Sequence, residues 1–141
     1  MDRLIGIDYG RKRVGIAHSD PMQIIASPLC TLPPAEALDF LQKYVRENPV
    51  EAIVVGQPHH TYDADAPVEV ETDIRAFIAR LAEVLPGIPV ERYDERFTSK
   101  IAAHDLFRSG ASRSKRREKG NLDMTSAAII LRDYMTARKN G

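Results

Sequence analysis

The sequence contains little of what a disulfide-stabilised or membrane-spanning protein needs. Its 141 residues include one cysteine and no tryptophan. A single cysteine cannot form an internal disulfide or supply a thiolate zinc site. No apolar run approaches the roughly 20 residues that a transmembrane helix requires. The first residues, Met1-Asp2-Arg3-Leu4, also lack the layout of a secretory signal. We therefore expect a cytoplasmic protein with no membrane partner.

A net charge is also absent, but the charges are distributed unevenly along the chain. The sequence has 20 basic and 20 acidic side chains, not counting histidine. Residues 34–95 contain five basic and thirteen acidic side chains, whereas residues 96–141 contain eleven basic and four acidic ones. This asymmetry indicates an anionic ligand for the basic part. The composition is otherwise that of an ordinary globular protein, and we expect residues 1–141 to form one domain.

The hydrophobic pattern predicts an α/β fold with a mixed sheet. The expected strands span residues 4–7, 14–17, 23–32, 52–56 and 88–93. The expected helices span residues 33–48, 67–85, 98–107 and 121–138, and a basic loop is expected over 110–120. Right-handed crossovers would make the first, fourth and fifth strands parallel, so their carboxyl ends would meet at one edge. Ligands of open α/β sheets bind at that edge.

Acidic residues stand at the ends of these strands. Asp8 closes the first strand, and Asp94 and Glu95 close the fifth. Asp123 enters the final helix on its apolar face. Clustered carboxylates repel unless a cation lies between them, and Mg²⁺ prefers oxygen ligands. Two such ions roughly 4 Å apart can activate water and stabilise the leaving oxygen in phosphodiester cleavage. Each acid has an ordinary alternative as a turn residue, a partner of the helix dipole or a surface ion pair, but their convergence favours a site.

A basic segment leads into Asp123. Six basic side chains stand against Glu118 between positions 108 and 119. They are Arg108, Arg113, Lys115, Arg116, Arg117 and Lys119. We expect this segment to bind a phosphate backbone, together with Arg11, Lys12, Arg13 and Arg96, although a solvated charged loop is the ordinary alternative. Few aromatic residues lie nearby, so extensive base stacking is not indicated.

The polar stretch after the fourth strand contains two adjacent histidines. His59-His60 precede Asp63 and Asp65, a composition that also suits a transition-metal site. Adjacent histidines rarely both bind one ion, so we expect a polar surface loop here.

Four motifs together resemble the YqgF (RuvX) family, in the same order and over nearly the whole chain. They are Ile7-Asp8-Tyr9-Gly10 with Arg13-Val14-Gly15-Ile16-Ala17, Val55-Gly56 before Pro58, Tyr93-Asp94-Glu95-Arg96-Phe97-Thr98-Ser99, and a C-terminal set from Lys119 through Asp123 to Tyr134. Residues 57–65 depart from the family, which commonly has a hydrophobic residue before the proline and a glycine a few residues later. The conformation of that loop is therefore left open.

The resemblance implies a ribonuclease H-like fold, with a mixed five-stranded sheet of order 3-2-1-4-5, an antiparallel second strand and flanking helices. It implies a metal-dependent nuclease that hydrolyses RNA and matures the 5′ end of pre-16S rRNA. By position, Asp8, Glu95 and Asp123 would be the catalytic acids and the ligands of Mg²⁺ or Mn²⁺, with Asp94 as the alternative to Glu95. The implied partner is pre-16S rRNA or branched DNA, and we expect a monomer or weak dimer because no dimer helix is apparent.

Three other functions are compatible with parts of this pattern. A Holliday-junction resolvase would use the same metal chemistry on four-way DNA, but symmetric nicking needs two sites and hence a dimer. A non-catalytic RNA-binding assembly factor would tolerate loss of the acids. An actin-like ATPase is disfavoured, because the chain is too short for two nucleotide-clamping lobes and lacks a Gly-rich loop such as GxxxxGK[ST].

Overall fold

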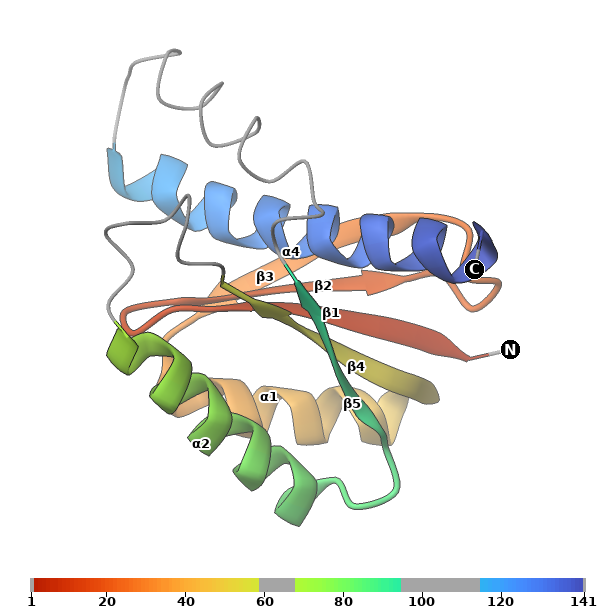
Figure 1. The fold of residues 1–141 in the computed structure, drawn as a ribbon, viewed down its shortest axis with the longest axis horizontal. Helices are drawn as coiled ribbons and strands as arrows, with labels where there is room; N and C mark the ends of the chain where they lie inside the picture. Colours follow the sequence, from red (N-terminus) through yellow and green to blue (C-terminus); the bar gives the residue numbers. More distant parts are fainter. Residues whose placement is uncertain (1, 59–67, 95–114, 141) are drawn as a thin grey trace.

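A five-stranded sheet lies between two layers of helices in the computed structural model, which describes residues 2–58, 68–94 and 115–140 (Figure 1). The elements are β1 (Arg3–Tyr9), β2 (Val14–Ser19), β3 (Ala26–Leu32), α1 (Pro34–Glu47), β4 (Val50–Gln57), α2 (Val68–Val84), β5 (Val90–Asp94) and α4 (Lys115–Asn140). Helices α1 and α2 cover one face of the sheet and α4 covers the other. The predicted α/β class is confirmed.

The strands follow the order β3-β2-β1-β4-β5, which confirms the predicted order. β2 is antiparallel to both of its neighbours, whereas β1, β4 and β5 are parallel to one another. The carboxyl ends of these three strands and the β1–β2 turn therefore lie at one end of the sheet. Figure 1 shows the first turns of α4, in light blue, at this same end, whereas the start of β1 and the end of α4 lie at the opposite end.

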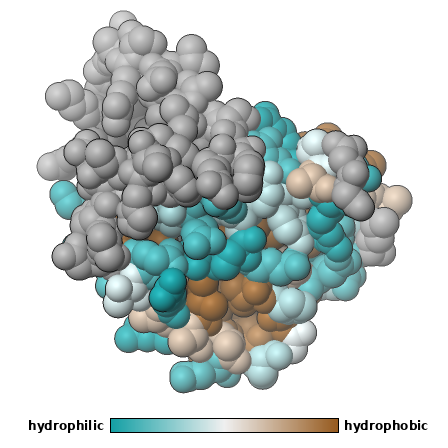
Figure 2. Space-filling model, in the orientation of Figure 1, coloured by the Kyte–Doolittle hydropathy of each residue, from teal (hydrophilic) through white to brown (hydrophobic). Residues whose placement is uncertain are grey.

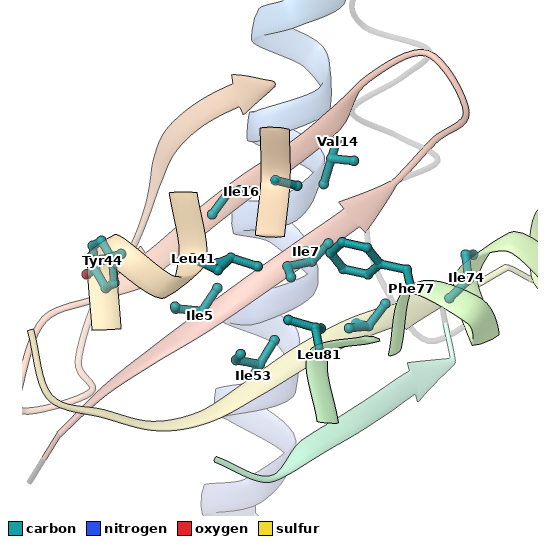
Figure 3. Packing of buried hydrophobic residues seen from close by; sticks show 12 residues of the cluster. Ile5, Ile7, Val14, Ile16, Leu41, Tyr44, Ile53, Ile74, Phe77 and Leu81 are labelled. Atoms are coloured by element: carbon teal, nitrogen blue, oxygen red, sulfur yellow. The ribbon is translucent and has the colours of Figure 1, made fainter. Parts of the chain in front are cut away.

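Alternating side chains along β1 divide the hydrophobic core into two parts. Ile5 and Ile7 face α1 and α2, whereas Leu4 packs against α4. Other buried residues on the side of α1 and α2 include Val14, Ile16, Leu41, Tyr44, Ile53, Ile74, Phe77 and Leu81 (Figure 3). Burying one large aliphatic side chain contributes about 1.5–3 kcal/mol, so these contacts hold α1 and α2 on the sheet.

The face of the molecule in Figure 2 is mainly hydrophilic where it is described, with a compact hydrophobic area below its centre. Within the described ranges, no helix combines the length and the apolar composition needed to cross a membrane. The buried apolar side chains form two clusters, one on each face of the sheet.

Gly6 allows α4 to lie directly on the backbone of β1. A Cβ atom at this position would lie 2.8 Å from the Ala127 carbonyl oxygen and 2.8 Å from the Leu131 Cβ. Both α4 residues are buried. Gly6 therefore sets how closely α4 approaches the sheet.

The third strand begins later than predicted. The sequence predicts a strand over 23–32, but β3 begins at Ala26. The Asp20 carboxylate accepts hydrogen bonds from three backbone N–H groups, those of Met22, Ile24 and Ile25. Because these groups are bound locally, the segment forms a turn instead of extending the strand. Ile24 and Ile25 are consequently 64% and 62% exposed.

The last helix begins earlier than predicted. The sequence predicts a loop up to Gly120, but α4 already begins at Lys115. The intervening Lys, Arg and Glu residues are good helix formers, and one glycine costs a helix only about 1 kcal/mol. The helix predicted over 98–107 lies outside the described residues.

We expect Gly6→Ala to lower the free energy of unfolding by about 1–3 kcal/mol, because the added methyl group overpacks the contact with α4. Gly87→Ala is the matched control, since a Cβ atom there would meet nothing within 4 Å. The control should change the free energy of unfolding by less than about 0.5 kcal/mol. Denaturant titration followed by circular dichroism measures both. A Gly6→Ala protein as stable as the control would contradict the close packing of α4.

Candidate active site between β1, β2 and α4

Asp8 lies on the α4 side of the sheet, near the end of β1. Along the strand it is in phase with Leu4 and Gly6, both of which face α4. The next residue, Tyr9, belongs to the other face, where its ring centroid lies 5.0 Å from that of Phe77. The Asp8 side chain is partly buried, and it therefore belongs to the surface on which α4 packs.

Asp123 reaches the same surface because of a second glycine. A Cβ atom at Gly15 would clash with the Asp123 carbonyl oxygen and lie 2.8 Å from the Met124 nitrogen, so the α4 backbone packs directly on Gly15. Gly15 pairs with Asp8 across the β1–β2 ladder. The fold thus places the backbone of Asp123 on the strand residue that pairs with Asp8, although the two acids lie near opposite ends of the sequence.

Arg13 forms an ion pair with Asp123. Its Nε lies 2.6 Å from Asp123 Oδ2, and the two side chains are 37% and 22% exposed. Arg13 lies in the β1–β2 turn, where the Gly10 N–H donates a hydrogen bond to the Arg13 carbonyl oxygen at 3.0 Å. A guanidinium therefore compensates the charge of one of the two acids.

The other basic residues of this turn point elsewhere. Arg11 pairs with Asp73 of α2, with 2.7 Å between Nε and Oδ2 and side chains that are 47% and 40% exposed. Lys12 is exposed. Arg11 and Arg13 are therefore bound to helices on opposite faces of the sheet.

Asp94, the last residue of β5, lies on the opposite face of the sheet from Asp8. Arg92 contacts Glu71 of α2, whereas Tyr93 packs on Tyr134 of α4, with their ring centroids 6.2 Å apart. Asp94 comes next and falls on the Arg92 side, opposite to Asp8. It pairs with Gln57 of β4, so β4 separates its strand from β1.

Several predicted site residues lie outside the described part of the chain. These are Glu95, Arg96, Arg108 and Arg113, together with His59-His60. Lys115, Arg116, Arg117 and Lys119 belong to the first turns of α4.

The described acids do not by themselves make up a metal site. Within residues 2–58, 68–94 and 115–140, no three His, Cys, Asp or Glu side chains are grouped so that they could hold a metal ion. Asp8 and Asp123 nevertheless provide carboxylate oxygens, the donors that Mg²⁺ prefers, on one face of the sheet. Their chemistry fits two ligands of such an ion.

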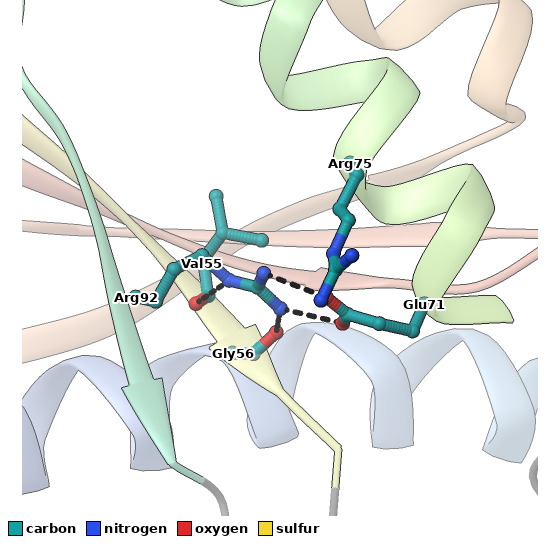
Figure 4. A network of polar contacts seen from close by, with 5 residues as sticks. All are labelled: Val55, Gly56, Glu71, Arg75 and Arg92. Atoms are coloured by element: carbon teal, nitrogen blue, oxygen red, sulfur yellow. Dashed lines mark hydrogen bonds and ion pairs between the residues drawn. The ribbon is translucent and has the colours of Figure 1, made fainter. Parts of the chain in front are cut away.

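Arg92 joins the ends of β4 and β5 to α2 (Figure 4). Its guanidinium donates to both carboxylate oxygens of Glu71, at 3.1 and 2.9 Å, and to the carbonyl oxygens of Val55 and Gly56, at 3.3 and 3.1 Å. Arg75 donates to Glu71 at 3.0 Å.

The hydrogen bonds from Arg92 are the main reason why the pKa of the Glu71 carboxyl is lowered. The signal for this network in the sequence is a charged residue in phase with the inward-facing Val90, and our sequence analysis missed it.

Tyr134 attaches α4 to β5 on the other face of the sheet. Its hydroxyl donates a hydrogen bond to the Glu91 carboxylate. Burial and this hydrogen bond raise the pKa of Tyr134 to about 12. The Arg138 guanidinium lies 5.5 Å from the centroid of the Tyr134 ring. The C-terminal half of α4 is thus fixed to the edge strand β5.

Comparison with known proteins assigns this arrangement to a family. The family model described as "RuvX: Holliday junction resolvase" matches residues 2–137. The chain belongs to the RuvX family. A relative from Flavobacterium johnsoniae is 42% identical over 139 residues, which cover 99% of each chain. A relative from Amoebophilus asiaticus is 45% identical over 139 residues, 99% of this chain and 97% of the relative. Both relatives bear the name "Putative pre-16S rRNA nuclease". The resemblance found in the sequence motifs is confirmed.

Solved structures confirm the fold expected for the RuvX family. The T. thermophilus RuvC in complex with Holliday junction substrate superposes with a TM-score of 0.57 at 18% identity, covering 97% of this chain and 96% of RuvC. A second structure of Thermus thermophilus RuvC gives a TM-score of 0.52 at 17% identity, covering 98% and 96%. At these identities the likeness establishes the ribonuclease H-like fold.

We expect Arg92→Met to lower the free energy of unfolding at pH 7 by about 1–3 kcal/mol, because it leaves Glu71 and two β4 carbonyl groups without their donor. Arg75→Met is the matched control: Arg75 contacts the same carboxylate but is 75% exposed, so it should cost less than about 0.5 kcal/mol.

The effect of Arg92→Met should also depend on pH with a defined sign. The pKa of Glu71 is lowered in the folded protein, so its contribution is present above the ordinary value of 4.5 and is lost as the pH falls through the folded pKa. The difference between wild type and Arg92→Met should therefore shrink below pH 4.5. Denaturant titrations from pH 7 to 3 measure it, and a difference that grows on acidification would contradict the role of Arg92.

Proposed function

We propose that this chain is a nuclease that hydrolyses phosphodiester bonds of RNA with the help of a divalent cation, and that it matures the 5′ end of pre-16S rRNA in the cytoplasm. The observation that carries the proposal is that, on the α4 face of the sheet, the backbone of Asp123 packs on Gly15, the residue that pairs with Asp8. The names of full-length relatives at 42–45% identity support the activity and the substrate class.

Asp8, Asp123 and Glu95 are the proposed ligands of Mg²⁺ or Mn²⁺. Glu95 is preferred to Asp94 because the strand position of Asp94 assigns it to the opposite face of the sheet from Asp8. When bound, a divalent cation activates a water molecule and stabilises the leaving oxygen of the phosphodiester. The contribution of the chain itself would be to hold these carboxylates in place, and the packing of the α4 backbone at Asp123 on Gly15 supports this role.

Basic residues are proposed to guide the RNA backbone to these acids. The β1–β2 turn with Arg11, Lys12 and Arg13 lies at the same end of the sheet as the first turns of α4, where four of the predicted basic residues stand (Figure 1). Their charge offsets the repulsion between an acidic site and a polyanion. The proposed backbone path therefore runs between the turn and α4.

The acids can be tested by single substitutions that keep the side-chain size. With Mg²⁺ and a 5′-extended pre-16S rRNA fragment, Asp8→Asn, Asp123→Asn and Glu95→Gln should each slow cleavage by at least about 100-fold, because each removes a charged ligand. Asp94→Asn is the matched control and should cleave at the wild-type rate. Unchanged cleavage by Asp8→Asn would overturn the proposal and favour a non-catalytic assembly factor.

A four-way DNA junction is the second candidate substrate. The description of the family model favours it. Incubating the same proteins with junction DNA and with the rRNA fragment in parallel separates the two substrates. Faster cleavage of the rRNA fragment supports the proposal, whereas symmetric nicking of the junction by a dimer would assign the metal chemistry to DNA.

Binding of RNA should depend steeply on salt. If about four phosphates are neutralised, the logarithm of the affinity should fall against the logarithm of the salt concentration with a slope near −3 for a single strand. Replacing Arg116 and Arg117 by glutamine, which also favours helices, should make the slope shallower by about 1.4. Fluorescence anisotropy with the Asp8→Asn protein measures binding without cleavage. A slope near zero would contradict backbone binding.

A further inference from the structure

We propose that Arg13 is an exchangeable counter-ion of Asp123. In the free protein its guanidinium pairs with the Asp123 carboxylate. With a divalent cation bound, the guanidinium of Arg13 would leave this carboxylate and bind a phosphate of the RNA. This inference rests on the proposed metal site, and its tests are chosen to separate the two.

The contact lies where an exchange is possible. Arg13 precedes the first residue of β2 in a tight turn, and its side chain is 37% exposed although its Nε lies 2.6 Å from Asp123 Oδ2. Arg92 provides the contrast within the same molecule. It makes four hydrogen bonds to Glu71 and to the end of β4, and it is 24% exposed. Arg92 is therefore a fixed structural cation, whereas Arg13 has a route to solvent.

The charges around Asp123 explain why an arginine would occupy it first. Asp8 and Asp123 share the surface beside Gly15, and two carboxylates held there repel each other. The guanidinium of Arg13 supplies one positive charge to this pair in the free protein. Asp8 and Asp123 would hold a divalent cation through carboxylate oxygens, so Arg13 would compete with that cation for the Asp123 carboxylate.

The released side chain would remain close to the site. Its backbone is held in the turn by the hydrogen bond between the Gly10 N–H and the Arg13 carbonyl oxygen. A guanidinium presents paired donors that match a phosphate as well as they match a carboxylate. Because metal and RNA both favour the released state, binding of one should favour binding of the other.

The same turn offers a matched control. Arg11 has the same side chain and an ion pair of nearly the same length, 2.7 Å, but its partner is Asp73 on the opposite face of the sheet. Arg11→Gln therefore removes the same charge from the same turn and leaves the ion pair between Arg13 and Asp123 in place.

The first experiment measures Mn²⁺ binding to the full chain by isothermal titration calorimetry. Arg13→Gln should bind Mn²⁺ about two- to fivefold more tightly than wild type, which is the range expected when a partly exposed ion pair no longer competes. Arg11→Gln should bind Mn²⁺ as wild type does. Arg13→Lys is the second variant in case Arg13→Gln does not fold, and because it keeps the charge it should tighten binding less.

The second experiment measures RNA binding in Ca²⁺ and in EDTA by fluorescence anisotropy. In Ca²⁺, Arg13→Gln should make the salt slope shallower by about 0.7, which corresponds to one lost phosphate contact on a single strand. In EDTA the slope should not change, because Arg13 is then bound to Asp123.

The outcomes separate the exchange from the proposed function. Equal Mn²⁺ affinity of Arg13→Gln and wild type, or weaker binding by the variant, overturns the exchange and leaves the nuclease proposal intact. If Arg11→Gln tightens Mn²⁺ binding as much as Arg13→Gln does, the change comes from the loss of any positive charge in the turn. That result also overturns the exchange. If wild type binds no Mn²⁺, the metal site and the exchange both fail.

Discussion

The packing of α4 directly on the backbone of β1 and β2 is the constraint on which the site depends. Gly6 and Gly15 have no Cβ atoms, so the helix backbone approaches to distances at which any other side chain would clash. The same contact that completes the second core therefore places Asp123 beside the strand residue that pairs with Asp8. A helix held farther out by ordinary side chains would still bury its apolar face, but it would separate the acids.

Two arginines show how differently the same type of side chain is held, and we propose that only one of them takes part in the chemistry. Arg92 is surrounded by a carboxylate and two main-chain carbonyl groups, so its charge is used to fix β4, β5 and α2 relative to one another. Arg13 stands in a turn at the rim of the site, on a carboxylate that a metal ion would also bind. Burial and the number of acceptors, rather than residue type, separate the two roles.

Much of the fold could be predicted because it depends on periodic patterns. The apolar run of β4 and the spacing of apolar residues in α1 and α2 correspond directly to the buried positions. Two predictions were wrong, the first residue of β3 and the first residue of α4. In each case a local polar interaction or a helix propensity overrode the hydrophobic pattern. Asp20 captures the backbone N–H groups of Ile24 and Ile25 and delays β3, and the charged residues from Lys115 onward extend α4 through what composition suggests is a loop.

The sequence by itself determined the order of the elements, the family and the identity of the candidate acids, because strand and helix periods and short motifs are local properties of the chain. Only the tertiary structure decided which acids share a face. The alternation of β5 assigns Asp94 to the α2 side, and the contact at Gly15 brings Asp123 to Asp8 and to Arg13. These neighbours depend on how segments that are distant in the sequence pack together. The close approach of α4 to the sheet depends on glycines in β1 and β2, and no local sequence pattern shows which helix will lie on them.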